Sequence, residues 1–469
     1  MTAPKSGANP HTAGIARFVS KLRYEDIPGE VIERIKLLIL DALGCALFGS
    51  ELEWSRILMT TLAEVDSGNG CGVWGTAQRF SAPHAALVNG TLVQSFELDD
   101  VHRQGVLHVG AVTLPPILAV AEMKGGMSGR NFLTAAVAGY EVGPRVGMCM
   151  GQEHIVQGWH SGATVGVFSA ATGAAAALKL SPEQTVHALG IAGTQSAGLM
   201  AAQFGAMVKR MHAGRSAQSG LYGALLAANG FTGIVDVFES PYGGFCTTFS
   251  RSTDRFNLEE LTSGLGTRFE TLRIALKFYS CVATNHTALD AIRKMREHRP
   301  FGPDDIAHIA VGSSQATLEH AGWPYRPEGM TSAQLNMPYC IATLLLEGDV
   351  FVDQFSDAMI ADPARMKLAE KVAVHEDPRI TALGSKFRHM VHVAVHLKDG
   401  TVLEDTVEAA RGSEKNFAPA TEVTAKFLKL AGKRLPAAQA QRILELVLRL
   451  EDLADIGGLV KALAREKQH

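Results

Sequence analysis

Ionisable side chains crowd into the stretch from Ser95 to His108, which reads SFELDDVHRQGVLH. They are Glu97, Asp99, Asp100, His102, Arg103 and His108. An apolar run over residues 83–96 precedes them, and the chain returns at once to VGAVTLPPILAVAE. Charges between two core segments favour a cleft, where burial and neighbours tune acids and bases. A solvated loop at a helix end would carry the same residue types, and the residues alone leave both interpretations open.

Two further stretches could supply a base and an anion site. His160, in GWHSG, directly precedes a small-residue helix, where the helix dipole favours the neutral imidazole that a base requires. A histidine that only caps and packs is the alternative. The segment KRMHAGRS from Lys209 to Ser216 puts cations beside a helix expected to start at Ala213, which is typical of an anion site. A solvated basic loop is the alternative, less natural between apolar flanks.

Two isolated residues belong with these stretches. Lys277 is a lone lysine in the apolar segment IALKFYSCVATNHTALDA, so it either extends to solvent or meets an anion. Tyr325 lies in the Pro-rich segment GWPYRP, which could close over a site or pack on the surface.

Several chemistries find no support in the sequence. GxSxG and GxxxxGK[ST] are absent, and His102 and His108 are spaced too loosely for a metal pair. The cysteines form no CxxC, which argues against a zinc ribbon or iron–sulfur cluster and predicts a reducing cytoplasm. Lysines with histidines favour abstraction of a proton beside a substrate carboxylate, with the cations stabilising the developing charge.

The overall composition is that of an ordinary globular protein. At 469 residues the chain predicts two domains, and a net charge of −3 gives no footprint for nucleic acid or an anionic membrane. The N-terminal MTAPKSGANPHTAG lacks the apolar region of a signal peptide. The uncharged segment 161–178 is rich in alanine, glycine, serine and threonine, so we expect a tightly packed core helix rather than a membrane span.

Periodicity predicts a mainly α fold in which a large helical domain carries a smaller inserted α+β lid. Helical spacing dominates residues 13–270 and predicts no sheet there. Strands are expected at 306–311 and 390–397, the second leading through Asp399-Gly400 into a hairpin, with helices at 332–346 and 363–371. Helical spacing resumes at Thr421. The predicted units are residues 1–267, a lid over 268–407, and C-terminal helices over 408–469 that return to the helical domain.

The chain also resembles the MmgE/PrpD family along nearly its whole length. The matching segments are LILDALGCALFGS, VNGTLVQSFELDDVHRQGVLHVGAV, GWHSGATVGVFSAA, KRMHAGRSAQSG, LKFYSCVATNHTALDA and ATEVTAKFLKLA. The resemblance implies a homodimer of helical and lid domains that acts without metal or other cofactor on small di- or tricarboxylates. Dehydration, as of 2-methylcitrate, decarboxylation and epimerisation are all activities of the family.

Mapped onto this sequence, the resemblance and the residue chemistry together give one working site. The expected catalytic residues are His108, His160, Lys209 and Lys277. The expected substrate-binding residues are Glu97, Asp100, His102 and Tyr325. The family usually has Thr where this chain has Val101, Pro where it has Val109 and Arg210, and Asp for Glu97 in its decarboxylase. These departures also leave open a non-catalytic carboxylate-binding protein on the same fold.

Overall fold

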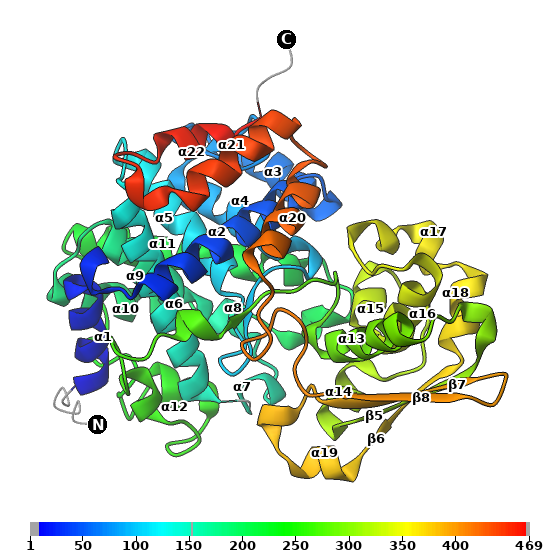
Figure 1. The fold of residues 1–469 in the computed structure, drawn as a ribbon. Coiled ribbons are helices and arrows are strands. Elements are labelled where there is room, and N and C mark those ends of the chain that lie inside the picture. The colour runs from blue at the N-terminus through cyan, green and yellow to red at the C-terminus, as the bar shows by residue number, and fades with distance from the viewer. Residues whose placement is uncertain (1–8, 152, 466–469) are drawn as a thin grey trace.

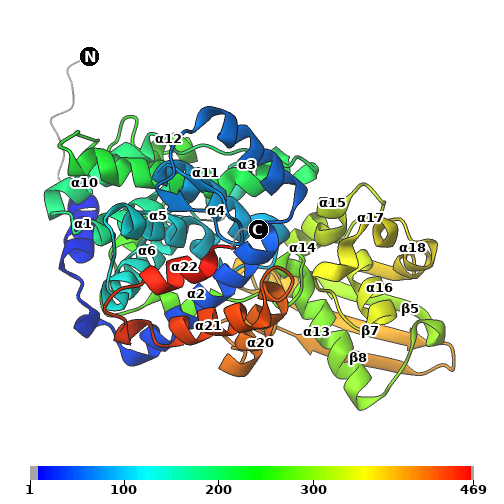
Figure 2. The same cartoon turned by 90° about the horizontal axis from the view of Figure 1, so that it is seen from above.

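The chain folds into two lobes, seen in a computed structural model that describes residues 9–151 and 153–465. The larger lobe is helical, and residues after about 280 form the smaller lobe before the C-terminal helices return to the larger one (Figures 1 and 2). The predicted mainly α fold with an inserted α+β unit is therefore confirmed. The boundaries at 267 and 407 stay a prediction.

Helices of the larger lobe follow the predicted apolar periodicity. They are α1 (Pro10–Lys21), α2 (Gly29–Gly49), α3 (Glu53–Val65), α4 (Ala82–Val93), α5 (Val109–Met123), α6 (Gly129–Met150), α7 (Glu153–Val156), α8 (Ser161–Thr164), α9 (Gly166–Ala177), α10 (Pro182–Gly193), α11 (Val208–Ala228) and α12 (Phe245–Ser250), joined by α20 (Ala420–Ala431), α21 (Ala437–Leu448) and α22 (Gly457–Leu463). None of the helices in the described part of the chain has both the length and the apolar character needed to cross a bilayer.

The larger lobe also contains strands, which corrects the expectation of no sheet before residue 270. β1 (Cys71–Gly72) pairs antiparallel with β2 (Arg79–Phe80). β3 (Val101–His102) pairs antiparallel with β4 (Ile274–Ala275). Two-residue strands carry too little alternation to be recognised in the sequence. The β3–β4 pair matters for the site because it sets the charged stretch beside Lys277.

The smaller lobe, called the lid below, is a four-stranded sheet with helices packed on it. Its strands run in the order β6 (Val372–Glu376), β5 (Ile306–Ser313), β7 (Val391–Leu397) and β8 (Val402–Val407), with only β5 and β6 parallel. Its helices are α13 (Ala283–His298), α14 (Gln315–Ala321), α15 (Met330–Leu335), α16 (Met337–Glu347), α17 (Asp357–Ile360), α18 (Pro363–Ala369) and α19 (Pro378–Ala382). The predicted hairpin is confirmed as β7–β8.

Glycines let the central helices approach closely enough to fix the site. A Cβ on Gly90 in α4 would lie 2.7 Å from the Cα of Gly214 in α11, and one on Gly214 would lie 2.0 Å from the Leu87 carbonyl oxygen. Any side chain at either position would therefore push the two helices apart. This crossing brings the first turn of α11, which carries Lys209, next to the C-terminal end of α4. The charged stretch follows directly after that end.

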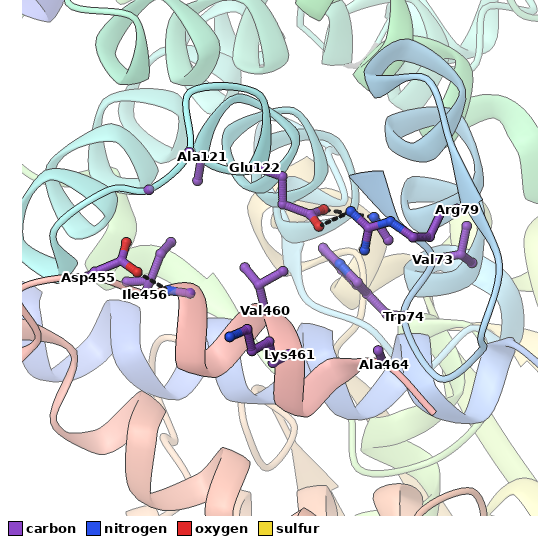
Figure 3. Close-up of a pocket in the computed structure, with 14 residues that line it drawn as sticks. Val73, Trp74, Arg79, Ala121, Glu122, Asp455, Ile456, Val460, Lys461 and Ala464 are labelled. Carbon is purple, nitrogen blue, oxygen red and sulfur yellow. Dashed lines mark hydrogen bonds and ion pairs between the residues drawn. The ribbon is translucent and has the colours of Figure 1, made fainter. Parts of the chain in front are cut away.

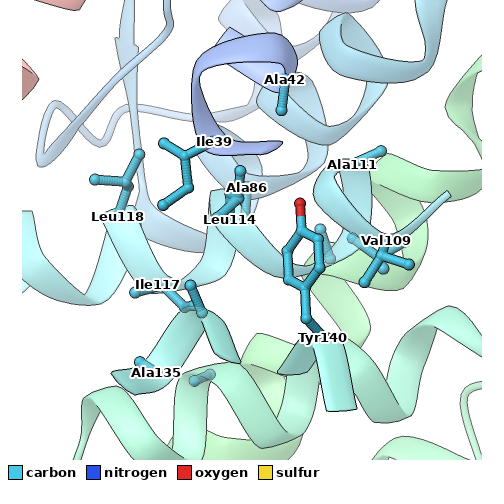
Figure 4. Packing of buried hydrophobic residues seen from close by; sticks show 14 of the residues in the cluster. Ile39, Ala42, Ala86, Val109, Ala111, Leu114, Ile117, Leu118, Ala135 and Tyr140 are labelled. Atoms are coloured by element: carbon cyan, nitrogen blue, oxygen red, sulfur yellow. The ribbon is translucent and has the colours of Figure 1, made fainter. Parts of the chain in front are cut away.

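Two hydrophobic cores meet at the charged stretch. The first is built from the larger lobe, and Figure 4 shows part of it around Tyr140, with Ile39, Val109 and Leu114. The second belongs to the lid but includes Phe96 and Leu98. The two residues that flank Glu97 are thus anchored in the lid core, and this fixes the backbone of Glu97 between the lobes.

Candidate active site

Glu97 is the centre of a buried charge cluster. The short 3-10 helix η2 (Gln94–Phe96) ends at Glu97, whose backbone adopts φ 55° and ψ 32°. Its side chain accepts hydrogen bonds from Lys209, from Arg210 Nη1 at 3.0 Å and from Lys277 Nζ at 3.3 Å. A left-handed backbone is unusual for a residue other than glycine. The three cations and the neighbouring core residues hold it in place.

The charges of this cluster stabilise one another. Burial raises the pKa of Glu97, but the nearby charges of Lys209, Lys277 and Arg210 outweigh it and hold that pKa well below its ordinary value. Burial lowers the pKa of Lys209 despite Glu97, whereas Glu97 and Asp99 overcome burial and raise the pKa of Lys277. Lys277 therefore stays a cation, and Lys209 is the easier of the two lysines to deprotonate.

His108 joins this cluster through Asp99. Its Nδ1 lies 3.0 Å from Asp99 Oδ2, while Asp99 Oδ1 lies 3.8 Å from Lys277 Nζ. His108 precedes α5 and is half-buried. A carboxylate that accepts a hydrogen bond from Nδ1 fixes the tautomer of an imidazole and leaves Nε2 for proton transfer. His108 is thus oriented as an acid or base within reach of the cations.

His160 is paired with a second histidine, which the sequence did not single out. His160 caps α8, and its Nδ1 lies 3.1 Å from Nδ1 of His212 in α11. Burial lowers the pKa of His160 far below its ordinary value, and Lys209, His212 and His108 lower it further. The prediction of a neutral imidazole at this position agrees with that environment. Since one Nδ1 must donate to the other, the two imidazoles share a single proton between their Nδ1 atoms.

Asp100 and His102 lie in the predicted stretch but have protein partners on both of their polar atoms. Asp100 accepts from the Gly110 amide at 2.9 Å and from Tyr140 Oη at 2.9 Å. His102 Nδ1 accepts from the Gly105 amide at 2.9 Å, and its Nε2 lies 3.1 Å from Glu270 Oε2. These hydrogen bonds hold the β3 loop in place. The role of both residues in substrate binding stays a prediction.

Tyr325 is also placed away from the cluster. Its hydroxyl donates to the Ile360 carbonyl at 2.8 Å, and its ring centroid lies 4.7 Å from that of Tyr339 within the lid. Burial raises the pKa of Tyr325. These contacts pack Tyr325 against the lid core, and its role in substrate binding stays a prediction.

Comparison with known proteins agrees with this architecture. The family model described as MmgE/PrpD N-terminal domain matches residues 13–257, and the MmgE/PrpD C-terminal domain matches residues 279–452. The chain belongs to the MmgE/PrpD family. It is 36% identical to the cis-aconitate decarboxylase-like protein oryM of Aspergillus oryzae, over 97% of both chains. It is 34% identical to the cis-aconitate decarboxylase of Aspergillus terreus, over 98% of this chain and 96% of that one. It is 23% identical to the mitochondrial 2-methylcitrate dehydratase of Yarrowia lipolytica, over 93% of this chain and 87% of that one.

For this member of the MmgE/PrpD family, sequence reasoning missed one contact of the site and misplaced one helix end. Gln334 in α15 donates to the Phe96 carbonyl at 3.1 Å and accepts from Arg210 Nη2 at 2.9 Å, so it ties the lid to the cluster. A lone glutamine has no signal that marks it. Helix α11 starts at Val208 rather than at Ala213. Lys209 and Arg210 therefore lie inside its first turn.

Within residues 9–151 and 153–465, no three His, Cys, Asp or Glu side chains are grouped as ligands of a metal ion would be. A surface pocket of about 330 Å³ lies between the end of α5, β1 and α22, where Arg79 pairs with Glu122 at 3.1 Å (Figure 3). None of the predicted site residues lines it. The predicted site residues Glu97, His108, Lys209 and Lys277 lie instead in the Glu97 cluster.

Proposed function

We propose that this chain is a lyase that decarboxylates cis-aconitate or a closely similar small carboxylic acid. The observation that carries the proposal is the convergence of Lys209, Arg210 and Lys277 beside the neutral pair of His160 and His212. Buried cations bind carboxylates and stabilise the enolate-like charge that forms beside one. The similarity to the cis-aconitate decarboxylase-like protein of Aspergillus oryzae and to the cis-aconitate decarboxylase of Aspergillus terreus supports decarboxylation over dehydration.

The proposed reaction needs only side chains that the cluster supplies. The bond between a carbon atom and one carboxylate breaks, and carbon dioxide leaves. Its electron pair passes into the neighbouring unsaturated carboxylate, whose charge Lys209 and Lys277 stabilise. A histidine, His108 or the His160–His212 pair, then delivers a proton to carbon and is reprotonated from solvent. We also propose that the reaction requires no metal ion or other cofactor.

The quaternary state and location form part of the same proposal. The exposed side chains of Val208, Tyr222 and Leu226 lie on one side of α11, and the exposed Phe231 follows that helix. Apolar residues exposed along one face suit a protein contact, which supports the homodimer implied by the resemblance. All six cysteines are free and buried, which supports a location in the reducing cytoplasm.

Proton NMR in D₂O tests the proposal directly. The purified protein is incubated with cis-aconitate, 2-methylcitrate, citrate and substituted succinates, beside the variants Lys209→Met and Lys433→Met. Lys433 lies on the surface and pairs with Asp353, so its variant controls for the loss of a lysine. We expect a decarboxylated alkene that carries one deuterium, formed by the wild type and the control but not by Lys209→Met.

Two other outcomes would contradict the proposal. Loss of water from a hydroxy acid, with cis-aconitate unchanged, would make the chain a dehydratase. Tight carboxylate binding in a thermal-shift assay, with no change in any NMR spectrum, would make it a binding protein.

A further inference from the structure

Gln94 is a buried side chain of the site that the reaction described above does not use. It is the first residue of η2, three positions before Glu97, and is 1% exposed. Neither Oε1 nor Nε2 of its amide has a hydrogen-bond partner among the residues that the structure describes. Buried polar side chains are almost always paired, because an unpaired amide away from water costs stability. The Gln94 amide is therefore ready to pair with a ligand.

This amide faces the imidazole of His160 across a glycine. A Cβ built on Gly162 would lie 3.7 Å from Gln94 Nε2, 3.3 Å from His160 Nδ1 and 3.0 Å from His160 Cε1. One point beside Gly162 is thus in contact with both side chains, and the glycine places no side chain there. Ser216 Oγ in α11 donates to the Gly162 carbonyl at 2.8 Å, which fixes the glycine in this position.

The site therefore has a charged side and a neutral side. On the charged side, Lys209, Arg210 and Lys277 surround Glu97. On the neutral side, the Gln94 amide lies near an imidazole that carries no charge, because burial holds the pKa of that histidine far below its ordinary value. The charges of Lys209 and Glu97 also act on that pKa, so the two sides adjoin.

Decarboxylation favours opposite surroundings at two carboxylates of the acid. The carboxylate that leaves loses its negative charge and becomes carbon dioxide, whereas the carboxylate that receives the electron pair gains charge. Cations beside the leaving group would stabilise the starting acid more than the transition state, and the same cations beside the receiving carboxylate stabilise the transition state more. A neutral amide holds a carboxylate by hydrogen bonds and releases carbon dioxide without opposing the loss of charge.

We propose that Gln94 binds the carboxylate that leaves as carbon dioxide, in the space beside Gly162 and the His160 imidazole. This inference rests on the proposed function and adds the orientation of the acid in the site. The bond between carbon and the leaving carboxylate breaks next to Gln94, the electron pair stays on the carbon skeleton, and carbon dioxide departs uncharged. The receiving carboxylate lies on the charged side. Gln94 thereby determines which carboxylate of the acid is lost.

Isothermal titration calorimetry with two matched, unreactive acids tests this orientation. Propane-1,2,3-tricarboxylate carries one terminal carboxylate that propane-1,2-dicarboxylate lacks. Gln94→Met keeps the length of the side chain without its amide, and Gln441→Met makes the same change at an exposed glutamine that donates to Glu445. Gln94→Met should weaken tricarboxylate binding about 10- to 100-fold, through loss of a hydrogen bond to a charged group. Dicarboxylate binding should change less than about twofold, and Gln441→Met should change neither.

Stability and kinetics distinguish a binding residue from a structural one. Because no described residue pairs with the Gln94 amide, Gln94→Met should keep or raise Tm, whereas loss of a structural hydrogen bond would lower it. In turnover of cis-aconitate, Gln94→Met should raise KM more than it lowers kcat, because the lost contact holds the starting carboxylate. Lys277→Met, on the charged side, should instead weaken the binding of both acids.

The pair of acids also defines the results that contradict this orientation. Equal tricarboxylate affinity of the wild type and Gln94→Met overturns it, and the proposed function stands if the wild type still decarboxylates cis-aconitate. Equal weakening of both acids, in Gln94→Met and in a second variant Gln94→Leu, also overturns it, because Gln94 would then support the fold rather than one carboxylate. A wild type that binds neither acid and converts no carboxylate overturns both the orientation and the proposed function.

Discussion

Replacing Asp100 by Asn should change how the stability of the protein depends on pH. Asp100 is fully buried, and burial raises its pKa from 3.8 to about 7, with the charge of Asp99 adding to the effect. Its partners are the Gly110 amide and the Tyr140 hydroxyl, which lies in the apolar core of Figure 4. Asn matches the shape of the protonated acid: its oxygen can accept from Gly110 and its amide can donate to Tyr140.

The sign and size of this pH-dependent change in unfolding free energy follow from proton linkage. Between about pH 4 and 7 the unfolded chain has an ionised Asp100 while the folded chain keeps it protonated. Folded protein then binds more protons, so the contribution to stability is complete below the unfolded pKa and is lost as pH rises to the folded pKa. Each pKa unit corresponds to about 1.4 kcal/mol, and two units lie between pH 5 and 7. The wild type should lose about 3 kcal/mol of unfolding free energy from this group, and Asp100→Asn should lose none of it.

Urea unfolding at about pH 5, 6, 7 and 8 measures this difference. The quantity compared is the free energy of unfolding of the wild type minus that of Asp100→Asn, at one protein concentration. It should fall by about 3 kcal/mol across the series. Asp377→Asn, at the N-cap of α19 on the lid, serves as a control for the loss of one carboxylate. A difference that stays constant with pH would refute the reasoning, because Asp100 would then titrate alike in both states.

Three further predictions concern the cluster itself. His160→Asn should lower kcat about 10²- to 10⁴-fold, and retention of more than about a tenth of wild-type kcat would exclude His160 as acid or base. Lys277→Met should raise KM and lower kcat together in steady-state assays; unchanged values of both would show that Lys277 does not contact the reacting acid. Glu97→Gln leaves Lys209, Arg210 and Lys277 without their carboxylate, so Tm should fall. Added propane-1,2,3-tricarboxylate should raise Tm more in this variant than in the wild type, and equal shifts would show that Glu97 does not compete for those cations.

The helical architecture could be predicted because periodicity reports burial. The apolar spacing of residues 29–49 and the alternation in 391–397 are confirmed by α2 and β7. Periodicity does not show where a predicted helix is interrupted. The helix expected over 332–346 is divided at Asn336, whose side chain accepts from the Tyr339 amide and caps α16. Strand β6 was missed because Val372–Glu376 is short and half exposed.

The site was predictable in its residue types but not in its orientations. A run such as Phe96-Glu97-Leu98 shows that a charge adjoins apolar residues, but not that Glu97 adopts a left-handed backbone. Neither spacing nor composition reveals that His389, almost 300 positions after Arg103, lines the same small cavity. Such contacts arise from the packing of the lid against the larger lobe, which no local pattern encodes.

Asp99 and Asp100 show how one dipeptide serves two purposes. Asp99 faces His108, which shares a hydrogen bond with it, and Lys277, whose ammonium group lies 3.8 Å away. Asp100 faces Tyr140 and the start of α5, where no cation is among its hydrogen-bond partners in the described chain. Two adjacent buried carboxylates cannot both ionise cheaply, so the neutral form of Asp100 below about pH 7 spares Asp99 the repulsion. Asp100→Asn should therefore make that relief permanent, because the amide carries no charge at any pH.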